Sequence, residues 1–349
     1  AVGSAIRQKT KVSAEKTDLH PYVESANILP QLFYLVDRSS AAKVRLEGLD
    51  TVVLTEGEKV SLQYLDILQN AKLVIDCDLG VWGADHVGYE MKSGILVLTQ
   101  KTKPTELGNY MIGGTLVYEG DLVNVDIGES MSGGAIIVKG NVSGKSIIGH
   151  QLKGNASIMI KGDYSPNEES HWGLGHQMQG GSIYVEKDAR GRIPIGTWME
   201  GGTIRVNGNV YESTQLGYGM KNGALIHVHS NCMAWEIGSH MEGGTIKIGK
   251  DGGNEIGLCM KNGRIHIAGN ATSEDHCIGD MMDGGTINID GNAGVVSNLM
   301  YGGEIRINGV FRGRYVYGGL GNVYERGRLI VPSLLARITG KLERSNIQR

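Results

Sequence analysis

Apolar and polar residues follow a pattern along this chain that returns about every 20 residues. The pattern is an apolar residue, a glycine, two variable residues and a methionine, as in Ile237 to Met241 and again in Ile256 to Met260. Neighbouring copies are mostly 19 to 22 residues apart. Self-similarity at a fixed period predicts a repeat architecture, in which each copy forms one structural unit and stacks on the next.

The pattern persists over most of the chain. Its apolar–glycine pair occurs ten times in succession, at Val87-Gly88, Leu107-Gly108, Ile127-Gly128, Ile148-Gly149, Leu174-Gly175, Ile195-Gly196, Leu216-Gly217, Ile237-Gly238, Ile256-Gly257 and Ile278-Gly279. Its last position holds Met91, Met111, Met131, Leu152, Met178, Met199, Met220, Met241, Met260 and Met282. Met300 continues this row without the glycine, and Leu68 is a candidate first member.

A turn and a strand follow each methionine. One residue separates the methionine from a Gly-Gly, Asn-Gly or Ser-Gly pair, which supplies the positive φ that a tight turn requires. Short alternating runs come next, such as TIRVNG, TIKIG, RIHIAG and EIRING. Alternation with a period of two predicts a half-buried strand. We expect Ile or Val on its inner face and Thr, Arg, Lys, His or Asn on its outer face.

These elements predict an all-β fold, a parallel β-helix of about 11–12 coils over residues 68–330. The period is too short for a strand–helix–strand crossover. A left-handed β-helix would need an apolar residue at every sixth position, which this motif does not supply. Stacked coils about 4.8 Å apart would direct the methionines inward. Residues 1–67 are expected to form an N-terminal cap, and residues 331–349 a C-terminal cap helix.

Composition and charge narrow the class of protein. Glycine accounts for 54 of the 349 residues, about twice its usual share, without the Gly-X-Y register of collagen. A net charge of −3 gives no electrostatic case for nucleic acid. No apolar run reaches about 18 residues, so we expect no membrane span. The N-terminus lacks a basic segment followed by an apolar one, so we expect no secretory signal and a cytoplasmic location.

The run apolar-Gly-x-x-Met-x-Gly-Gly-x-Ile-x-Ile-x-Gly, from Ile278 to Gly291, resembles the glycine-motif (GXGXG) β-helix family. That family includes the β-helix subunits of formylmethanofuran dehydrogenase and of the formyltransferase/hydrolase complex, and the C-terminal domain of the glutamate synthase large subunit. The resemblance covers about residues 68–330 and implies a right-handed β-helix. Because the β-helix is nearly the whole chain, its length favours the formylmethanofuran dehydrogenase type. The longer N-terminal segment and looser coils at 152–178 and 212–236 depart from the family.

The resemblance implies a non-catalytic scaffold subunit of an oxidoreductase or formyltransferase/hydrolase complex in one-carbon metabolism. In that family an amidohydrolase-like subunit is catalytic, and a tungsten or molybdenum pterin lies on another subunit. We therefore expect protein partners, and neither a cofactor nor catalytic residues on this chain.

Two alternatives stay open at this point. One is a stand-alone glutamate synthase-type β-helix protein that serves amidotransfer. The other is a carbohydrate-active β-helix enzyme, which would have clustered Asp, Arg or Lys on an outer strand face. A groove holding two carboxylates about 5–9.5 Å apart would favour such a hydrolase, and a bare flat face would favour the scaffold.

Two irregular stretches are candidate interaction surfaces. Residues 163–175 enlarge their coil, and insertions in repeats often lie on the binding face. Residues 311–328 mix arginine with tyrosine, two residue types enriched at protein interfaces. The candidate interface residues are Trp172, Arg312, Arg314, Tyr315, Tyr317, Tyr324 and Arg326.

Some histidines and cysteines have the chemistry of metal ligands. His240 and Cys259 fall in the column that precedes the methionines, with His276 and Cys277 nearby in sequence, and the segment HVHSNC contains His227, His229 and Cys232. A closed metal site needs four converging ligands, so packing and solvated edges explain these residues better, and no metal site is expected.

Outward strand residues form a polar column. Its members are Arg205, Lys247, His266, Asn288 and Arg306. We interpret this column as a solvated face, with a docking face for a partner as the alternative.

Overall fold

The structure is a computed structural model that describes residues 43–46, 51–56, 72–79, 85–221, 223–271, 277–296, 299–311 and 320–331. Within these ranges the chain forms strands, bridges and turns and has no helix. Stacked parallel strands make a β-solenoid of about 11 turns, which confirms the predicted all-β, parallel β-helix fold. The chain divides into two compact units, an N-terminal unit (Ala1–Gly162) and a C-terminal unit (Asp163–Arg349).

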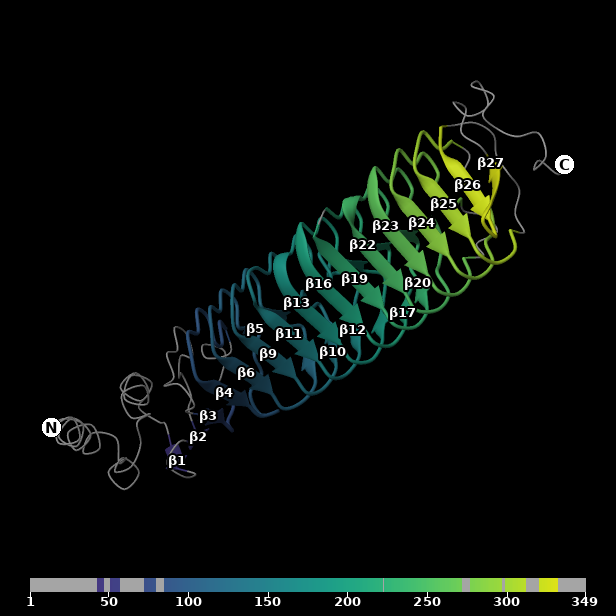
Figure 1. The fold of residues 1–349 in the computed structure, drawn as a ribbon. Helices are drawn as coiled ribbons and strands as arrows, with labels where there is room; N and C mark the ends of the chain where they lie inside the picture. The colour runs from purple at the N-terminus through teal and green to yellow at the C-terminus, as the bar shows by residue number, and fades with distance from the viewer. Residues whose placement is uncertain are drawn as a thin grey trace. The chain divides into compact units, whose positions relative to one another are not determined.

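The main sheet of the N-terminal unit has the strand order β1-β2-β3-β4-β6-β9-β11 (Figure 1). β1 pairs antiparallel with β2, and the pairs from β2 to β11 are parallel. The strands are Lys43–Leu46 (β1), Thr51–Glu56 (β2), Lys72–Ile75 (β3), Ile95–Leu98 (β4), Thr115–Tyr118 (β6), Ala135–Val138 (β9) and Ser157–Ile160 (β11).

The main sheet of the C-terminal unit has the order β13-β16-β19-β22-β23-β24-β25-β26-β27. Its pairs are parallel up to β26, and β27 turns back antiparallel on β26. The strands are Gln179–Val185 (β13), Gly201–Val206 (β16), Ala224–Val228 (β19), Glu242–Ile248 (β22), Asn262–Ile267 (β23), Thr286–Ile289 (β24), Glu304–Ile307 (β25), Asn322–Glu325 (β26) and Arg328–Val331 (β27).

Short strands on two further sides complete the coils, so the coils are three-sided. In the N-terminal unit they are Glu106–Leu107 (β5), Asp126–Ile127 (β8), Leu122–Val123 (β7) and Val142–Gly144 (β10). In the C-terminal unit they are Tyr164–Pro166 (β12), Ala189–Arg190 (β14), Val210–Tyr211 (β17), Cys232–Met233 (β20), Pro194–Ile195 (β15), Gln215–Leu216 (β18) and Glu236–Ile237 (β21).

The methionine row lies inside the solenoid, as predicted. Every member from Met91 to Met282 has an exposed fraction of 0%, and that of Met300 is 5%. Leu68 lies outside the described residues. Each fully buried Met or Ile side chain contributes roughly 1.5–3 kcal/mol. Repeated on every coil, this burial offsets the conformational entropy that a glycine-rich backbone loses on folding.

Three positions of each repeat have a left-handed backbone, which explains the motif. In one coil they are Gly238 (φ 68°), His240 (φ 56°) and Gly244 (φ 80°). A Cβ at Gly238 would lie 2.5 Å from Cδ1 of Ile265, a core residue of the next strand. The middle position tolerates larger residues, although a left-handed backbone costs them about 1–2 kcal/mol.

A ladder of Asn and Asp side chains supports another corner of the C-terminal unit. The backbone N–H of Asn209 donates to Oδ1 of Asp188 at 2.7 Å, and that of Asn231 donates to Oδ1 of Asn209 at 3.2 Å. Further rungs are formed by Asp251, Asn270 and Asn292. These side chains satisfy backbone donors where the chain turns, so the glycine that closes many strand runs is only part of the turn signal.

The predicted caps fall mostly outside the described residues. Within residues 1–67, β2 pairs in parallel with β3, so parallel stacking includes a strand of that segment. The predicted helix over residues 331–349 lies outside the described residues except for Val331, which ends β27. The described part of the chain contains no helix of the length and apolar character needed to cross a bilayer.

Candidate functional site

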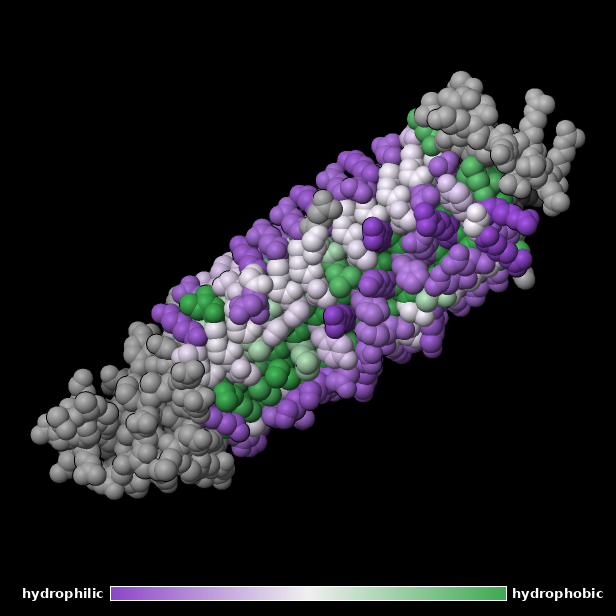
Figure 2. Space-filling view, in the orientation of Figure 1, coloured by the Kyte–Doolittle hydropathy of each residue, from purple (hydrophilic) through white to green (hydrophobic). Residues whose placement is uncertain are grey.

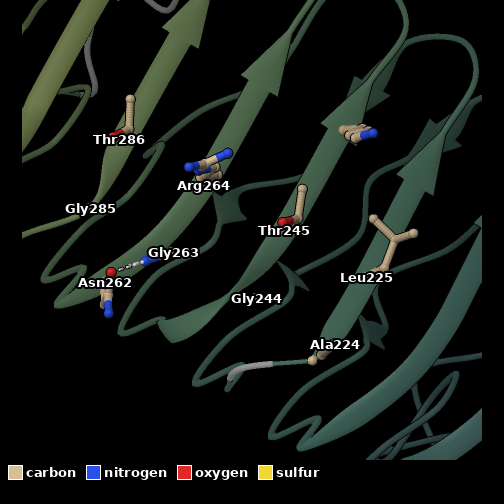
Figure 3. Close-up of a pocket in the computed structure, with 11 residues that line it drawn as sticks. Ala224, Leu225, Gly244, Thr245, Asn262, Gly263, Arg264, Gly285 and Thr286 are labelled. Atoms are coloured by element: carbon tan, nitrogen blue, oxygen red, sulfur yellow. Dashed lines mark hydrogen bonds between the residues drawn. The ribbon is translucent and has the colours of Figure 1, made fainter.

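A groove crosses the outer face of the main sheet in the C-terminal unit. It has a volume of about 730 Å³ and spans β19, β22, β23 and β24 (Figure 3). Thr245, Arg264 and Thr286 stand side by side on its wall, in register on successive strands. On this face, residues of near-neutral hydropathy lie between hydrophilic side chains (Figure 2).

The floor of the groove is a column of glycines from the turn pairs of the repeat. Gly244 and Gly285 have φ values of 80° and 87°. A Cβ on Gly244 would lie 2.7 Å from the carbonyl oxygen of Lys221, and a Cβ on Gly285 would lie 2.6 Å from Cε of Met260. Side chains are therefore excluded from this column, and stacking the turn glycines of successive coils creates the hollow.

Two cations of the groove have no counterion among the residues that the structure describes. Lys247 and Arg264 are exposed, and neither forms an ion pair or a side-chain hydrogen bond with any residue in the described ranges. Arg205 lies in the same outward column as Lys247, with His227 between them. The members of the predicted outward column are in register on one face of the sheet.

Neighbouring cations of the C-terminal unit are instead held by carboxylates. The pairs Lys221–Glu200, Lys261–Glu242 and Arg306–Glu304 have N···O distances of 2.7–2.8 Å. The hydrogen bond with Glu200 raises the pKa of Lys221, and that with Lys261 lowers the pKa of Glu242. The unpaired cations of the groove therefore differ from those of the adjacent surface.

The groove is flanked by two stacked histidines. The rings of His227 and His229 are stacked, with centroids 3.9 Å apart. Burial lowers the pKa of His227, and the charges of His229, Lys247 and Arg205 lower it further. Since nearby positive charge opposes protonation of an imidazole, this shift agrees with a positive electrostatic potential at the outer face.

The outer face of the N-terminal unit carries an aliphatic column, although the sequence pattern predicts polar residues on the outer face of each strand. Val74, Val97, Val117, Ile137 and Met159 are in register on β3, β4, β6, β9 and β11. Their neighbours along each strand point into the core, so this column points outward. Met159 has an exposed fraction of 36%. Val97 is largely covered, with an exposed fraction of 7%, and Lys72, Thr115 and Ser157 lie on the same outer face, two residues earlier in their strands.

Aromatic side chains gather at one corner of the C-terminal unit, in and next to the turns that join the glycine and the methionine of each repeat. It comprises Trp172, His176, Trp198, Tyr218 and His240. Ring centroids are 6.0 Å apart for Trp172–His176, 5.2 Å for Trp198–Tyr218 and 5.0 Å for Tyr218–His240. The side chains of Trp172 and Trp198 each have an exposed fraction of 45%. Trp198 also has a left-handed backbone, with φ 57°, which is uncommon for a bulky residue.

The candidate interface residues that the structure describes do not form one site. Trp172 precedes β13, whereas Tyr324 and Arg326 belong to the β26–β27 hairpin, seven strands further along the sheet. The guanidinium of Arg306 lies 6.0 Å from the ring centroid of Tyr324, and Arg326 is exposed. The candidates outside the described residues are Arg312, Arg314, Tyr315 and Tyr317.

The histidines and cysteines are not arranged as a metal site within the described ranges. No group of three or more His, Cys, Asp or Glu side chains there has the geometry to hold a metal ion. His240 and Cys259 do fall in one stacked column, and His276 lies outside the described residues. Burial raises the pKa of the Cys232 thiol to about 12 and also raises that of Cys259, so both thiols are protonated at neutral pH.

The class of protein that this geometry defines is a parallel β-solenoid with different outer faces on its two units. No protein-family model, curated protein or solved structure matches the chain. The outer surfaces therefore carry the functional information.

Proposed function

We propose that this protein is a non-catalytic scaffold subunit of a multi-subunit enzyme complex, and that a partner protein covers the outer face of the N-terminal unit. The aliphatic outer column from Val74 to Met159 carries this proposal. Parallel strands that are apolar on both faces are typical of sheets covered on both sides. Contiguous exposed apolar surface with a polar border marks protein interfaces.

The border of this face is polar. Lys139 and Glu119 form an ion pair at 2.8 Å just beyond the ends of β9 and β6. An apolar centre with a charged rim is the usual arrangement of a protein interface. The backbone ladder fixes the spacing of the column, so the face offers a partner a preformed surface with little entropy to lose on binding.

The resemblance of the repeat motif to the β-helix subunit of formylmethanofuran dehydrogenase supports a choice of partner. We assign that partner as an amidohydrolase-like catalytic subunit. Hydrolysis and the tungsten or molybdenum pterin would then belong to partner chains in a cytoplasmic complex, with this chain holding them in position.

The groove supports the scaffold over the carbohydrate-active alternative. A glycosidase of the usual kind needs two carboxylates across its substrate. Among the described residues that line the groove there is no carboxylate, and its charged residues are Lys247 and Arg264.

A double substitution on the outer face of the N-terminal unit tests the proposal. Val117→Thr with Ile137→Thr keeps the β-branched shape that suits a strand and replaces apolar groups at the proposed interface by hydroxyls. We expect affinity for the amidohydrolase-like subunit to fall at least tenfold, because burying an unpaired hydroxyl costs about 1–3 kcal/mol at each position. Titration calorimetry with the purified partner measures the change.

The matched control is Tyr184→Thr with Asn288→Thr, on the outward column of the C-terminal unit. It is expected to bind the partner as the unmodified chain does. Equal affinity of the Val117/Ile137 variant and the control would contradict the proposal. So would recovery of the native protein as a monomer that does not associate with the hydrolase subunit.

A further inference from the structure

We propose that the groove of the C-terminal unit is a binding site for a small molecule with a diphosphate or a similar pair of adjacent phosphate groups. This inference is independent of the scaffold role. It depends on two unpaired cations, a hydroxyl-bearing wall and a floor without side chains, all within one hollow.

The two cations are placed to act on one ligand. Lys247 is in register with His266, and Arg264 with Thr245, so the two cations lie diagonally on neighbouring strands. Strand geometry puts their Cα atoms roughly 8 Å apart. Their long side chains can therefore converge on two linked phosphates, with Arg264 offering a fork of donors and Lys247 a compact charge.

Hydroxyls complete the donor set. Thr245 and Thr286 flank Arg264 on the wall of the groove, as Figure 3 shows. Hydroxyl donors beside a guanidinium suit the several oxygens of a phosphate group.

The glycine floor lets an anion approach the backbone closely. Gly244, Gly263 and Gly285 line the groove with backbone alone, and a Cβ on each would point inward, 2.6–2.8 Å from Cε of a buried methionine of the preceding coil. In phosphate-binding loops, glycines serve the same purpose of close approach. A floor made of backbone therefore suits a compact anionic ligand better than a bulky side chain of a partner protein.

The size of the hollow favours a small molecule over an acidic protein segment. Its volume of about 730 Å³ falls in the range of small-molecule sites. It crosses four strands, or three strand spacings of about 4.8 Å, which gives a length of roughly 14 Å. Arg205 and His227 extend the positive surface beyond one side of the groove and favour the approach of an anion.

Calorimetric titration of the full-length chain with inorganic pyrophosphate, at low ionic strength, tests the site. We expect the unmodified protein to bind pyrophosphate, and Lys247→Gln with Arg264→Gln to weaken binding at least tenfold. The matched control is Lys221→Gln with Lys261→Gln, which removes the same charge from lysines held by Glu200 and Glu242. We expect the control to change affinity less than threefold.

Each outcome decides the proposal. Absence of pyrophosphate binding to the unmodified protein would overturn it, and so would an equal loss in the control, which would indicate non-specific attraction. Citrate serves as the comparison anion. Citrate binding as tight as pyrophosphate binding, with the same dependence on Lys247 and Arg264, would overturn the assignment to phosphate. All four substituted residues are exposed, so matching thermal unfolding curves will show that the variants fold.

Discussion

Replacing Gly202 by alanine is expected to destabilise the C-terminal unit by about 2–5 kcal/mol. Gly202 has φ 84°, where a non-glycine residue costs about 1–2 kcal/mol. Its new Cβ would also lie 2.5 Å from the carbonyl oxygen of Gly180 and 2.9 Å from that of Gly181. Both obstacles are backbone atoms of the preceding coil and cannot rotate away. Urea unfolding followed by circular dichroism measures the loss.

The control for this substitution is Gly327→Ala. Gly327 has φ 75°, but no atom lies within 4 Å of the position that a Cβ would take, so alanine there meets only the backbone strain of about 1–2 kcal/mol. The difference between the two variants isolates the close approach of the coils. Equal destabilisation would show that stacking does not restrict the turn glycines.

Met282→Ala is expected to lower the free energy of unfolding by about 2–5 kcal/mol, as for other fully buried methionines. Met282 has an exposed fraction of 0%, and its Cε lies 2.6 Å from where a Cβ would stand on Gly303 of the next coil. Removing this side chain leaves a cavity that the rigid backbone ladder cannot fill. Denaturant unfolding of the full-length chain measures the effect.

Met281 provides a control from the same turn. Its side chain has an exposed fraction of 40%. Met281→Ala therefore deletes the same atoms as Met282→Ala, but at the surface and not in the core. We expect a change within about 0.5 kcal/mol. A larger effect at Met281 than at Met282 would contradict the structure, because it would mean that Met281, and not Met282, packs in the core.

The interior of the fold was predictable from the sequence because one motif encodes it. The apolar residue, the methionine and the alternating strand point inward on every coil, and the glycines mark left-handed turns. A signal repeated ten times identifies these positions without knowledge of long-range contacts. The same regularity predicted the stacked column of His240 and Cys259.

The outer faces were predicted less well. The runs ILVL, TLVY, AIIV and SIMI are apolar without alternation, and this signal of a doubly covered strand was present in the sequence. Alternation in the C-terminal repeats extends only in part to these strands, so the prediction missed their aliphatic outward column. The proposed partner protein would cover this column.

The groove depends on relations between coils that no single repeat displays. Gly244 and Gly285 read as turn residues in sequence, and only stacking places them in one floor. Lys247 was predicted to point outward, but Arg264 was not included in that column. Whether a cation is paired depends on carboxylates about 20 residues away, as Lys221 with Glu200 and Lys261 with Glu242 show.

The aromatic corner was likewise visible only in part. Trp172 was identified from the enlarged coil, whereas Trp198 was not among the candidate interface residues. Their ring neighbours His176 and Tyr218 were not predicted, because each contributes a single aromatic ring to a cluster that spans several coils.

Methionine oxidation by dilute hydrogen peroxide, read by peptide mass spectrometry, tests the central claim most directly, since the reaction follows exposure of the sulfur. In the isolated protein, Met159, Met233 and Met281 should oxidise quickly, because their exposed fractions are 36–44%, and the buried row should react slowly. With the partner bound, Met159 alone of these three should become protected. Buried methionines that react as fast as Met281, or a Met159 that reacts equally with and without the partner, would contradict the account.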